Sequence, residues 1–216
     1  MIGPHQGQRV ATAGATLAEA QAAMVMVHGR GATAESILTL VPALARPQFA
    51  YLAPQAGGNT WYPYGFMSPI SQNEPGISSG LQAIRDVLQQ VTAADITPER
   101  TVLLGFSQGA CLMLEFAAHH ARRYGGIAGL SGGLIGPDGT PRDYAGSLDG
   151  TPVFLGCSDV DAHIPQHRVE LTARLLQALG GAVTMQLYPG MGHLVNDDEI
   201  VQVQAIMDGV AIGPKA

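Results

Sequence analysis

The sequence offers a candidate nucleophile at Ser107, within the motif Gly105-Phe106-Ser107-Gln108-Gly109. An apolar stretch precedes this motif, and an apolar, helix-forming stretch follows it. A Gly-x-Ser-x-Gly motif in that context is typical of a nucleophile elbow, a tight turn that lifts the serine hydroxyl above a sheet. The two glycines keep the turn free of bulky side chains. The amide of Gln108, at the helix N-terminus, faces the same space and favours developing negative charge there.

A serine hydroxyl is a weak nucleophile unless a base takes its proton and a third group orients that base. In hydrolases with a nucleophile elbow, the base is a histidine that follows both the serine and the acid in the sequence. His193 ends the turn Gly190-Met191-Gly192-His193, directly after an alternating, strand-like stretch, and we predict it as the base. The other downstream histidines are predicted to be helix-surface or loop residues: His119, His120, His163 and His167.

A carboxylate must orient that histidine, and two aspartates are candidates. Asp159 and Asp161 both follow the apolar stretch 152–156, and a loop adjustment would bring either of them to the imidazole. We favour Asp161 and predict the other aspartate to be a turn residue with local backbone hydrogen bonds. Asp159 stays open as the alternative acid.

A second oxyanion donor is expected on the loop after the apolar stretch 24–27, which is typical of a buried parallel strand. This loop reads His28-Gly29-Arg30-Gly31-Ala32. Because glycines flank Arg30, the backbone can turn the Arg30 amide towards the serine, and we predict that amide as the second donor. For the side chains of His28 and Arg30, a structural role is an equal alternative to a functional one.

Several further stretches accompany these motifs along the chain. The joint occurrence and the order of all these stretches resemble those of the phospholipase/carboxylesterase family of small α/β-hydrolases, which includes acyl-protein thioesterases. The stretches that carry the resemblance are His28-Gly29-Arg30-Gly31, Ala53-Pro54-Gln55-Ala56, Trp61-Tyr62, Ile96-Thr97-Pro98-Glu99-Arg100, Gly105-Phe106-Ser107-Gln108-Gly109, Leu130-Ser131-Gly132 and Gly190-Met191-Gly192-His193. Only about the first two dozen residues lie outside the resemblance.

The resemblance implies an α/β-hydrolase fold and a site whose members can be carried over one by one. They are a catalytic triad of Ser107, Asp161 and His193, with oxyanion amides from Arg30 and Gln108. One departure lies before the acid, where the family usually has His-Gly and this chain has Cys157-Ser158. An ungapped count from Pro152 still reaches Asp161, but the departure keeps Asp159 open.

The elements that must position these residues alternate between strands and helices. Apolar strands are predicted near 24–27, 49–53, 101–106, 127–131, 152–156 and 182–188, and helical spacing recurs between them and after the last of them. Such alternation predicts the α/β class, with a mostly parallel central sheet covered by helices on both faces. Residues 196–199 read as the capped start of the last helix, and residues 9–17 are expected to form an edge hairpin.

Length and composition favour one domain over residues 1–216, because 46% of the residues are hydrophobic and 13% are charged. The apolar runs are too short for a membrane span, and residues 1–8 lack a signal-peptide layout. A cytoplasmic protein without stable membrane insertion is therefore expected. The net charge of −6 does not indicate a surface that binds nucleic acid.

No cofactor and no metal is expected, because the histidines and carboxylates lack metal-ligand spacing. The two cysteines do not make a disulfide framework. Cys111 falls in the helix after the serine, and Cys157 ends the strand that precedes the acid; both are predicted to be packing residues.

The function predicted is a serine carboxylesterase for small to medium carboxylic esters, with thioesters as a further class, acting through an acyl-enzyme. Two alternatives stay open: a lysophospholipase or acyl-protein thioesterase with a long-chain preference, and a non-catalytic binding protein on a hydrolase scaffold. The aromatic stretch 57–77 is predicted to line the substrate pocket, with Trp61 and Tyr62 in its wall. A small-molecule ester is the expected partner, and homodimer formation is left open.

Overall fold

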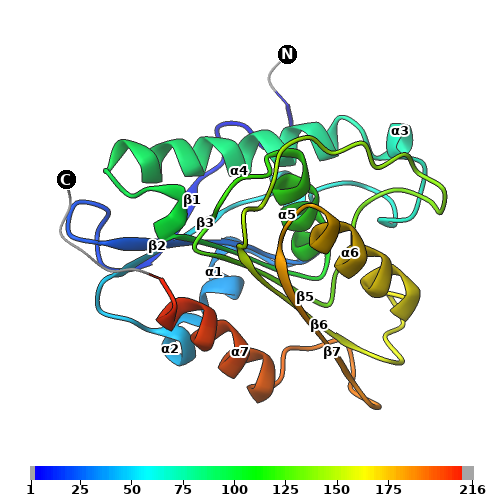
Figure 1. Cartoon of the computed structure of the whole chain (residues 1–216). Coiled ribbons are helices and arrows are strands. Elements are labelled where there is room, and N and C mark those ends of the chain that lie inside the picture. Colours follow the sequence, from blue (N-terminus) through cyan, green and yellow to red (C-terminus); the bar gives the residue numbers. More distant parts are fainter. Residues whose placement is uncertain (1–2, 211–216) are drawn as a thin grey trace.

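A seven-stranded sheet organises residues 3–210, which are the residues that the computed structural model describes (Figure 1). Its strand order is β1-β3-β2-β4-β5-β6-β7, and every neighbouring pair is parallel except β1 with β3. The strands are β1 (Val10–Gly14), β2 (Ala22–Val27), β3 (Phe49–Pro54), β4 (Thr101–Phe106), β5 (Gly126–Leu130), β6 (Pro152–Ser158) and β7 (Ala182–Tyr188). All six predicted strands are present.

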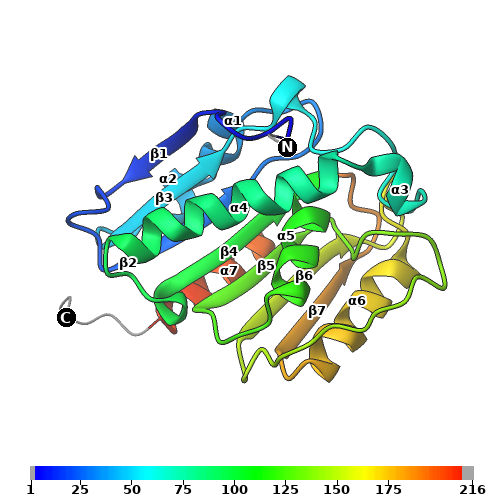
Figure 2. The ribbon, with the colours of Figure 1, turned by 90° about the horizontal axis from the view of Figure 1, so that it is seen from above.

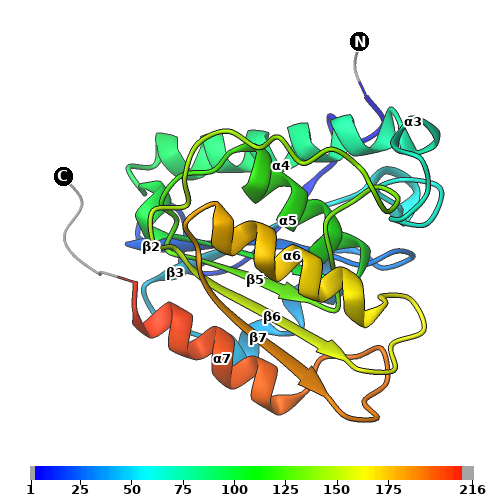
Figure 3. The ribbon, with the colours of Figure 1, turned by 45° about the vertical axis from the view of Figure 1, so that its right-hand side comes forward.

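Helices cover both faces of this sheet, as predicted (Figures 1 and 3). One face carries α4 (Gly76–Ala93), α5 (Gln108–His119) and α6 (Gln166–Ala178), and the other carries α1 (Ala34–Leu38), α2 (Val41–Leu44) and α7 (Asp197–Asp208). The remaining elements are short: α3 (Ile70–Asn73) and the 3₁₀ turns η1 (Gly57–Asn59) and η2 (Pro98–Arg100).

Alternate residues of each central strand pack into opposite helix layers. In β4, Leu103 belongs to the core beneath α4, α5 and α6, whereas Val102 and Leu104 belong to the core on the α7 side. Because both faces are covered, the strand reads as a continuous apolar run and not as an alternating one. Each fully buried aliphatic side chain of this kind contributes roughly 1.5–3 kcal/mol to folding.

The parallel arrangement brings the loops after β2, β4, β6 and β7 to one edge of the sheet. These loops carry Arg30, Ser107, Asp161 and His193. Ligands of open α/β sheets bind outside the carboxyl ends of the strands, so the candidate residues converge on the edge where a site is expected.

The predicted N-terminal hairpin is wrong. Residues 10–14 form the single strand β1, which pairs antiparallel with β3 from Val10 opposite Pro54 to Gly14 opposite Ala50. Figure 2 shows β1 at the border of the sheet, beside β3. An unpaired outer side of β3 would leave a row of backbone groups exposed, and β1 satisfies them along its whole length.

The single-domain prediction covers 1–216, of which residues 1, 2 and 211–216 lie outside the described part. Within residues 3–210, no helix has the length and apolar character needed to span a membrane.

Candidate active site

Ser107 sits at the turn between β4 and α5 with φ 56° and ψ −123°, a conformation that L-residues rarely adopt. The neighbouring glycines make this turn sterically feasible. A Cβ atom on Gly105 would lie 2.4 Å from the Gly109 carbonyl oxygen, and one on Gly109 would lie 2.2 Å from the Val27 carbonyl oxygen. The strained backbone is held in place because the Ser107 N–H donates to the Leu130 carbonyl at 2.9 Å.

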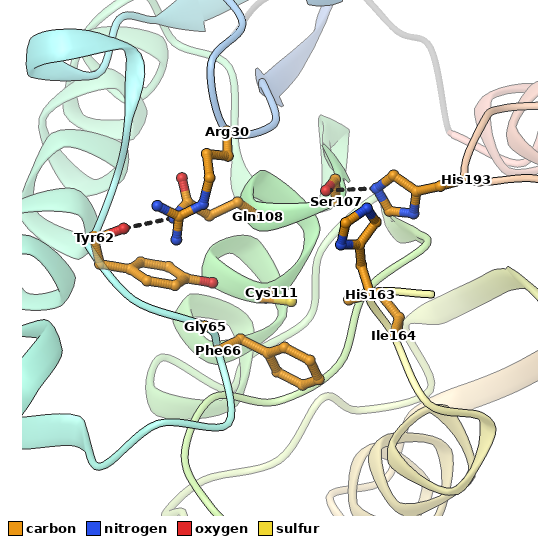
Figure 4. Close-up of a pocket in the computed structure, with 10 residues that line it drawn as sticks. All are labelled: Arg30, Tyr62, Gly65, Phe66, Ser107, Gln108, Cys111, His163, Ile164 and His193. Carbon is orange, nitrogen blue, oxygen red and sulfur yellow. Dashed lines mark hydrogen bonds between the residues drawn. The ribbon is translucent and has the colours of Figure 1, made fainter. Parts of the chain in front are cut away.

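A continuous chain of hydrogen bonds joins the serine, the histidine and one aspartate. His193 Nε2 lies 2.7 Å from Ser107 Oγ, and His193 Nδ1 lies 2.7 Å from Asp161 Oδ2 (Figure 4 shows the serine–histidine contact). A carboxylate only accepts, so Nδ1 carries the proton and Nε2 is free to accept from the hydroxyl. This tautomer is the one a general base needs.

The Asp161 carboxylate is fully buried and has several donors. Besides His193, its Oδ1 accepts from the backbone N–H groups of His163 at 2.8 Å and Ile164 at 3.0 Å. The Cys157 thiol points at Oδ2 from 3.7 Å. Burial alone would raise the pKa of Asp161, but the hydrogen bonds from His193, His163 and Ile164 hold this pKa below its ordinary value. The carboxylate therefore stays ionised beside the imidazole.

Asp159 has a different position. Its Oδ1 accepts from the Gly190 N–H at 2.8 Å and so ties the acid loop to the turn that carries His193. The structure thus brings Asp161, and not Asp159, to the imidazole.

The two predicted oxyanion donors both face the cavity in front of Ser107. Among residues 3–210, the backbone N–H groups of Arg30 and Gln108 have no hydrogen-bond partner. Their side chains are engaged elsewhere: Gln108 accepts from the Trp61 N–H and donates to the Tyr62 carbonyl, at 2.9 and 2.8 Å. Arg30 donates to the carbonyls of Pro63 and Tyr64. The side chains position the aromatic loop, and the amides remain free for a ligand.

His28 holds the loop that carries Arg30 in place. Its Nε2 accepts from the Ala56 N–H at 3.1 Å, its Nδ1 donates to the Gly29 carbonyl at 2.8 Å, and burial lowers the pKa of the ring. A neutral imidazole satisfies both bonds. Of the two roles left open for this side chain, the structure supports the structural one.

A cavity of about 290 Å³ opens beside Ser107 (Figure 4). Its lining residues are Arg30, Tyr62, Gly65, Phe66, Ser107, Gln108, Cys111, His163, Ile164 and His193. The Tyr62 hydroxyl lies against the Cys111 thiol. Burial raises the pKa of Tyr62 well above its ordinary value and that of Cys111 to about 11. Both groups therefore stay neutral near pH 7, and this wall of the cavity carries no charge.

Trp61 does not line this cavity, which corrects its predicted place in the pocket wall. The indole is fully buried behind the loop that carries Arg30, where Nε1 donates to the His28 carbonyl at 2.9 Å. A buried indole needs a partner for its N–H, and the nearest one lies in the core. Tyr62, the next residue, faces the cavity as predicted.

Outside the stretch 57–77, sequence reasoning missed three lining residues: Cys111, His163 and Ile164. Phe66 lies in the aromatic stretch 57–77, and Cys111 lies one helical turn after Ser107, so the expected elbow helix could have indicated it. Ile164 and His163 follow the acid loop, and the His163 ring lies 4.8 Å from the His193 ring, edge to face. His163, predicted to be a loop residue, is a loop residue that also forms part of the cavity wall.

The loop that carries His193 is followed by a capped helix, as predicted. The side chain of Asn196 accepts from the Glu199 N–H, and the Glu199 carboxylate accepts from the Asn196 N–H at 3.0 Å, which completes a capping box. The second carboxylate oxygen of Glu199 is buried without a partner. Burial, supported by the charge of Asp198, raises the pKa of Glu199 to about 7.

This buried carboxyl predicts a pH-dependent stability. Its pKa is about 7 in the folded state and 4.5 at its ordinary value, so between these values only the folded state holds the proton. The free energy of unfolding therefore falls as the pH rises from about 4.5 to 7, by roughly 3 kcal/mol for this group. Glu199→Gln keeps the cap acceptor and removes the titration. Urea unfolding at pH 5 and pH 8 should show the variant gaining stability relative to the wild type at the higher pH; a difference that is the same at both values would contradict the prediction.

Among residues 3–210, no group of three or more histidine, cysteine or acidic side chains is placed to hold a metal ion.

Comparisons with known proteins agree with the fold and with the predicted family. A family model described as Phospholipase/Carboxylesterase matches residues 15–210. This chain belongs to that family. Its fold is the α/β-hydrolase fold, and its family is one of hydrolases.

Three similar proteins illustrate the relationship. A crystal structure of a phospholipase/carboxylesterase from Dyadobacter fermentans is 40% identical, with a TM-score of 0.90 over 93% of this chain and 96% of its own. An acyl-protein thioesterase 1 of Gibberella zeae is 34% identical over 66% of this chain, and the match spans 63% of that relative's length. The Bacillus cereus carboxylesterase is 16% identical with a TM-score of 0.73 over 95% of this chain and 96% of its own, a likeness of fold alone.

Proposed function

We propose that this protein is a serine carboxylesterase that hydrolyses small to medium carboxylic esters, with thioesters as a further class, through an acyl-enzyme intermediate. The observation that carries the proposal is the unbroken chain from Ser107 through His193 to Asp161, with 2.7 Å at each link, at the wall of a cavity. The substrate is a small molecule, and the compartment proposed is the cytoplasm.

In the first step, Ser107 Oγ attacks the carbonyl carbon of the bound ester while His193 Nε2 takes the hydroxyl proton. The carbonyl oxygen becomes an oxyanion, and the free amides of Arg30 and Gln108 are the donors that stabilise it. The imidazolium formed at His193 lies 2.7 Å from the ionised Asp161, which offsets its charge. Removing one such oxyanion donor raises the barrier of an acyl transfer by about 3–4 kcal/mol in a well-studied case.

The intermediate then collapses. The bond between the carbonyl carbon and the leaving-group oxygen, or sulfur in a thioester, breaks, and His193 passes its proton to the leaving group. The acyl group remains on Ser107 Oγ. A water molecule repeats the sequence: His193 takes its proton, the hydroxide attacks the acyl carbon, and the proton returns to Ser107 as the carboxylic acid leaves.

The cavity supports a short or medium acyl group. Its volume is about 290 Å³, and Phe66 lines it on the side away from Ser107 (Figure 4). The Arg168 guanidinium lies 5.3 Å from the Phe66 ring centroid. Tyr62, Cys111 and Ile164 complete an uncharged wall. Each methylene that such a wall removes from water contributes about 0.8 kcal/mol, or about fourfold in kcat/KM, until the cavity is full.

A series of p-nitrophenyl esters tests this substrate class. We expect kcat/KM to rise with acyl length from acetate through the short chains and then to fall, with palmitate a poor substrate. Phe66→Ala should move the optimum to longer chains because it removes a bulky side chain from the cavity wall opposite Ser107. Exposed Tyr64→Ala on the same loop is the matched control and should leave the optimum in place.

A second candidate, an acyl-protein thioesterase with a long-chain preference, is favoured by the name of the Gibberella zeae relative. In the ester series it would give the highest kcat/KM at the longest acyl chain in the wild-type protein. A non-catalytic binding protein would give no turnover with any ester and no covalent labelling of Ser107 by a fluorophosphonate.

A further inference from the structure

A second cavity lies on the same face of the sheet, at the other end of helix α5. Its volume is about 520 Å³, which exceeds the 290 Å³ beside Ser107, and the two cavities share no lining residue. Helix α5 begins directly after Ser107, and its last residue, His119, lies about 16 Å further along the helix axis. The second cavity is therefore not an extension of the candidate active site.

Much of the lining of this cavity is apolar. The apolar part is formed by Leu88 and Ala93 of α4, by Phe116 of α5, by Pro98 of η2 and by Tyr124 in the segment between α5 and β5, and the polar part includes Gln89, Thr92 and Thr101. No described acidic residue contributes to the lining. Apolar surface gathered in a concavity of this size is typical of a small-molecule site.

Three basic residues line the same cavity: Arg85, His120 and Arg122. The His120 ring stacks on Phe116 with centroids 4.3 Å apart, and its Nδ1 donates to the Phe116 carbonyl at 3.0 Å. Its Nε2 accepts from the Arg85 guanidinium. Because one ring nitrogen donates and the other accepts, the imidazole is neutral and cannot balance the charge of the arginine.

The positive charge at the cavity has little local compensation. Neither Arg85 nor Arg122 has a carboxylate within ion-pairing distance among residues 3–210. Glu99 offsets part of the Arg122 charge from a distance: hydrogen bonds with Thr97 and with its own backbone lower the pKa of Glu99, and the charges of Arg122 and Arg123 lower it further. Burial lowers the pKa of His120, and the charges of Arg85, His119 and Arg122 lower it further. A local excess of positive charge contrasts with the net charge of −6 of the whole chain.

We propose that this cavity is a binding site for a small carboxylate with an apolar body. The carboxylate pairs with Arg85 and Arg122, whose planar guanidinium groups match its geometry, and the apolar body covers the accessible side chains of Leu88, Ala93 and Pro98. The dipole of α5 opposes an anion at its C-terminal end, but this effect is weaker than a charge-assisted pair with guanidinium and acts over the last turn only. The inference does not depend on ester hydrolysis.

Octanoate is the probe that tests this site, with the full-length protein and nuclear magnetic resonance of the histidine rings. The His120 signals are identified by their loss in His120→Gln. Octanoate should shift them in a saturable manner and raise the pH at which they titrate, because an anion beside Arg85 and Arg122 favours the imidazolium. Octanol, which has the same apolar body without charge, should leave that titration unchanged.

Variants separate this site from the cavity at Ser107, where a carboxylate can also bind. Arg85→Gln and Arg122→Gln should each weaken the octanoate affinity read at His120 about five- to tenfold. They should not change the affinity read at the His193 signals. The control is Arg174→Gln, an exposed arginine of α6 outside both cavities. The proposal is overturned if octanoate shifts His193 alone, if octanol acts on His120 as octanoate does, or if neither arginine variant changes the affinity.

Discussion

Ser107→Ala is expected to lower kcat/KM for a short-chain p-nitrophenyl ester by at least about a thousandfold. The hydroxyl is the group that forms the covalent bond to the acyl carbon, and no other side chain that lines the cavity next to His193 carries a hydroxyl apart from Tyr62, whose pKa is raised by burial. The loss is large because the serine, the histidine and the aspartate act as one unit, so removal of one member removes most of their joint effect.

The fold should survive this substitution because alanine is smaller than serine and meets the same backbone strain. The Ser107 N–H bond to the Leu130 carbonyl does not involve the side chain. Ser131→Ala is the matched control: Ser131 follows β5, also has a positive φ, 50°, is buried, and has no hydrogen bond to a histidine. Equal melting temperatures with activity lost only at Ser107 would support the assignment. More than about a tenth of the wild-type turnover in Ser107→Ala would exclude Ser107 as the nucleophile.

The fold could be predicted because its central strands are buried on both faces. Continuous apolar runs such as Val102–Leu104 are typical of strands that helices cover on both faces of a sheet, and this is where the structure has them. The edge was less predictable. In β1, Val10 and its neighbours are half exposed, so their hydrophobic pattern does not indicate which strand they pair with. The antiparallel pairing with β3 depends on the rest of the sheet.

Ser107 and His193 could be predicted as neighbours because strained turns leave a local signature. Small residues must flank the serine, and a glycine turn after the last strand precedes the histidine, so both appear as short motifs. Asp161 and Asp159 differ by two positions in one loop, and local sequence does not fix which carboxylate turns inward. The choice depends on the amides of His163 and Ile164, which bind only one of them.

The cavity wall was the least predictable part of the site. In the aromatic stretch 57–77, each ring can face either the core or the cavity, and the loop has no periodicity that separates the two. The direction is decided by distant partners: the His28 carbonyl takes the Trp61 indole, and the Gln108 side chain fixes the backbone on either side of it. Tyr62 and Phe66 are left to face the cavity.

Asp161→Asn is expected to lower kcat/KM by roughly 10³- to 10⁴-fold. The asparagine can still accept from the amides of His163 and Ile164 through its oxygen, so the loop should keep its shape. Its amide group would then face His193 Nδ1 and donate to it. The ring would have to carry its proton on Nε2, and this tautomer cannot accept the Ser107 proton.

Asp159→Asn is the matched comparison, because the same change is made two residues away in the same loop. Its oxygen can still accept from the Gly190 N–H, so the turn before His193 should stay in place and kcat/KM should change by less than about threefold. Both variants are assayed with one ester at a pH where the wild type has reached its maximum, and their melting temperatures are compared. A large loss in Asp159→Asn with little change in Asp161→Asn would reverse the assignment and make Asp159 the acid. A large loss in Asp161→Asn alone would show that the charge and tautomer control at His193 come from Asp161, since the two variants remove the same charge from neighbouring positions.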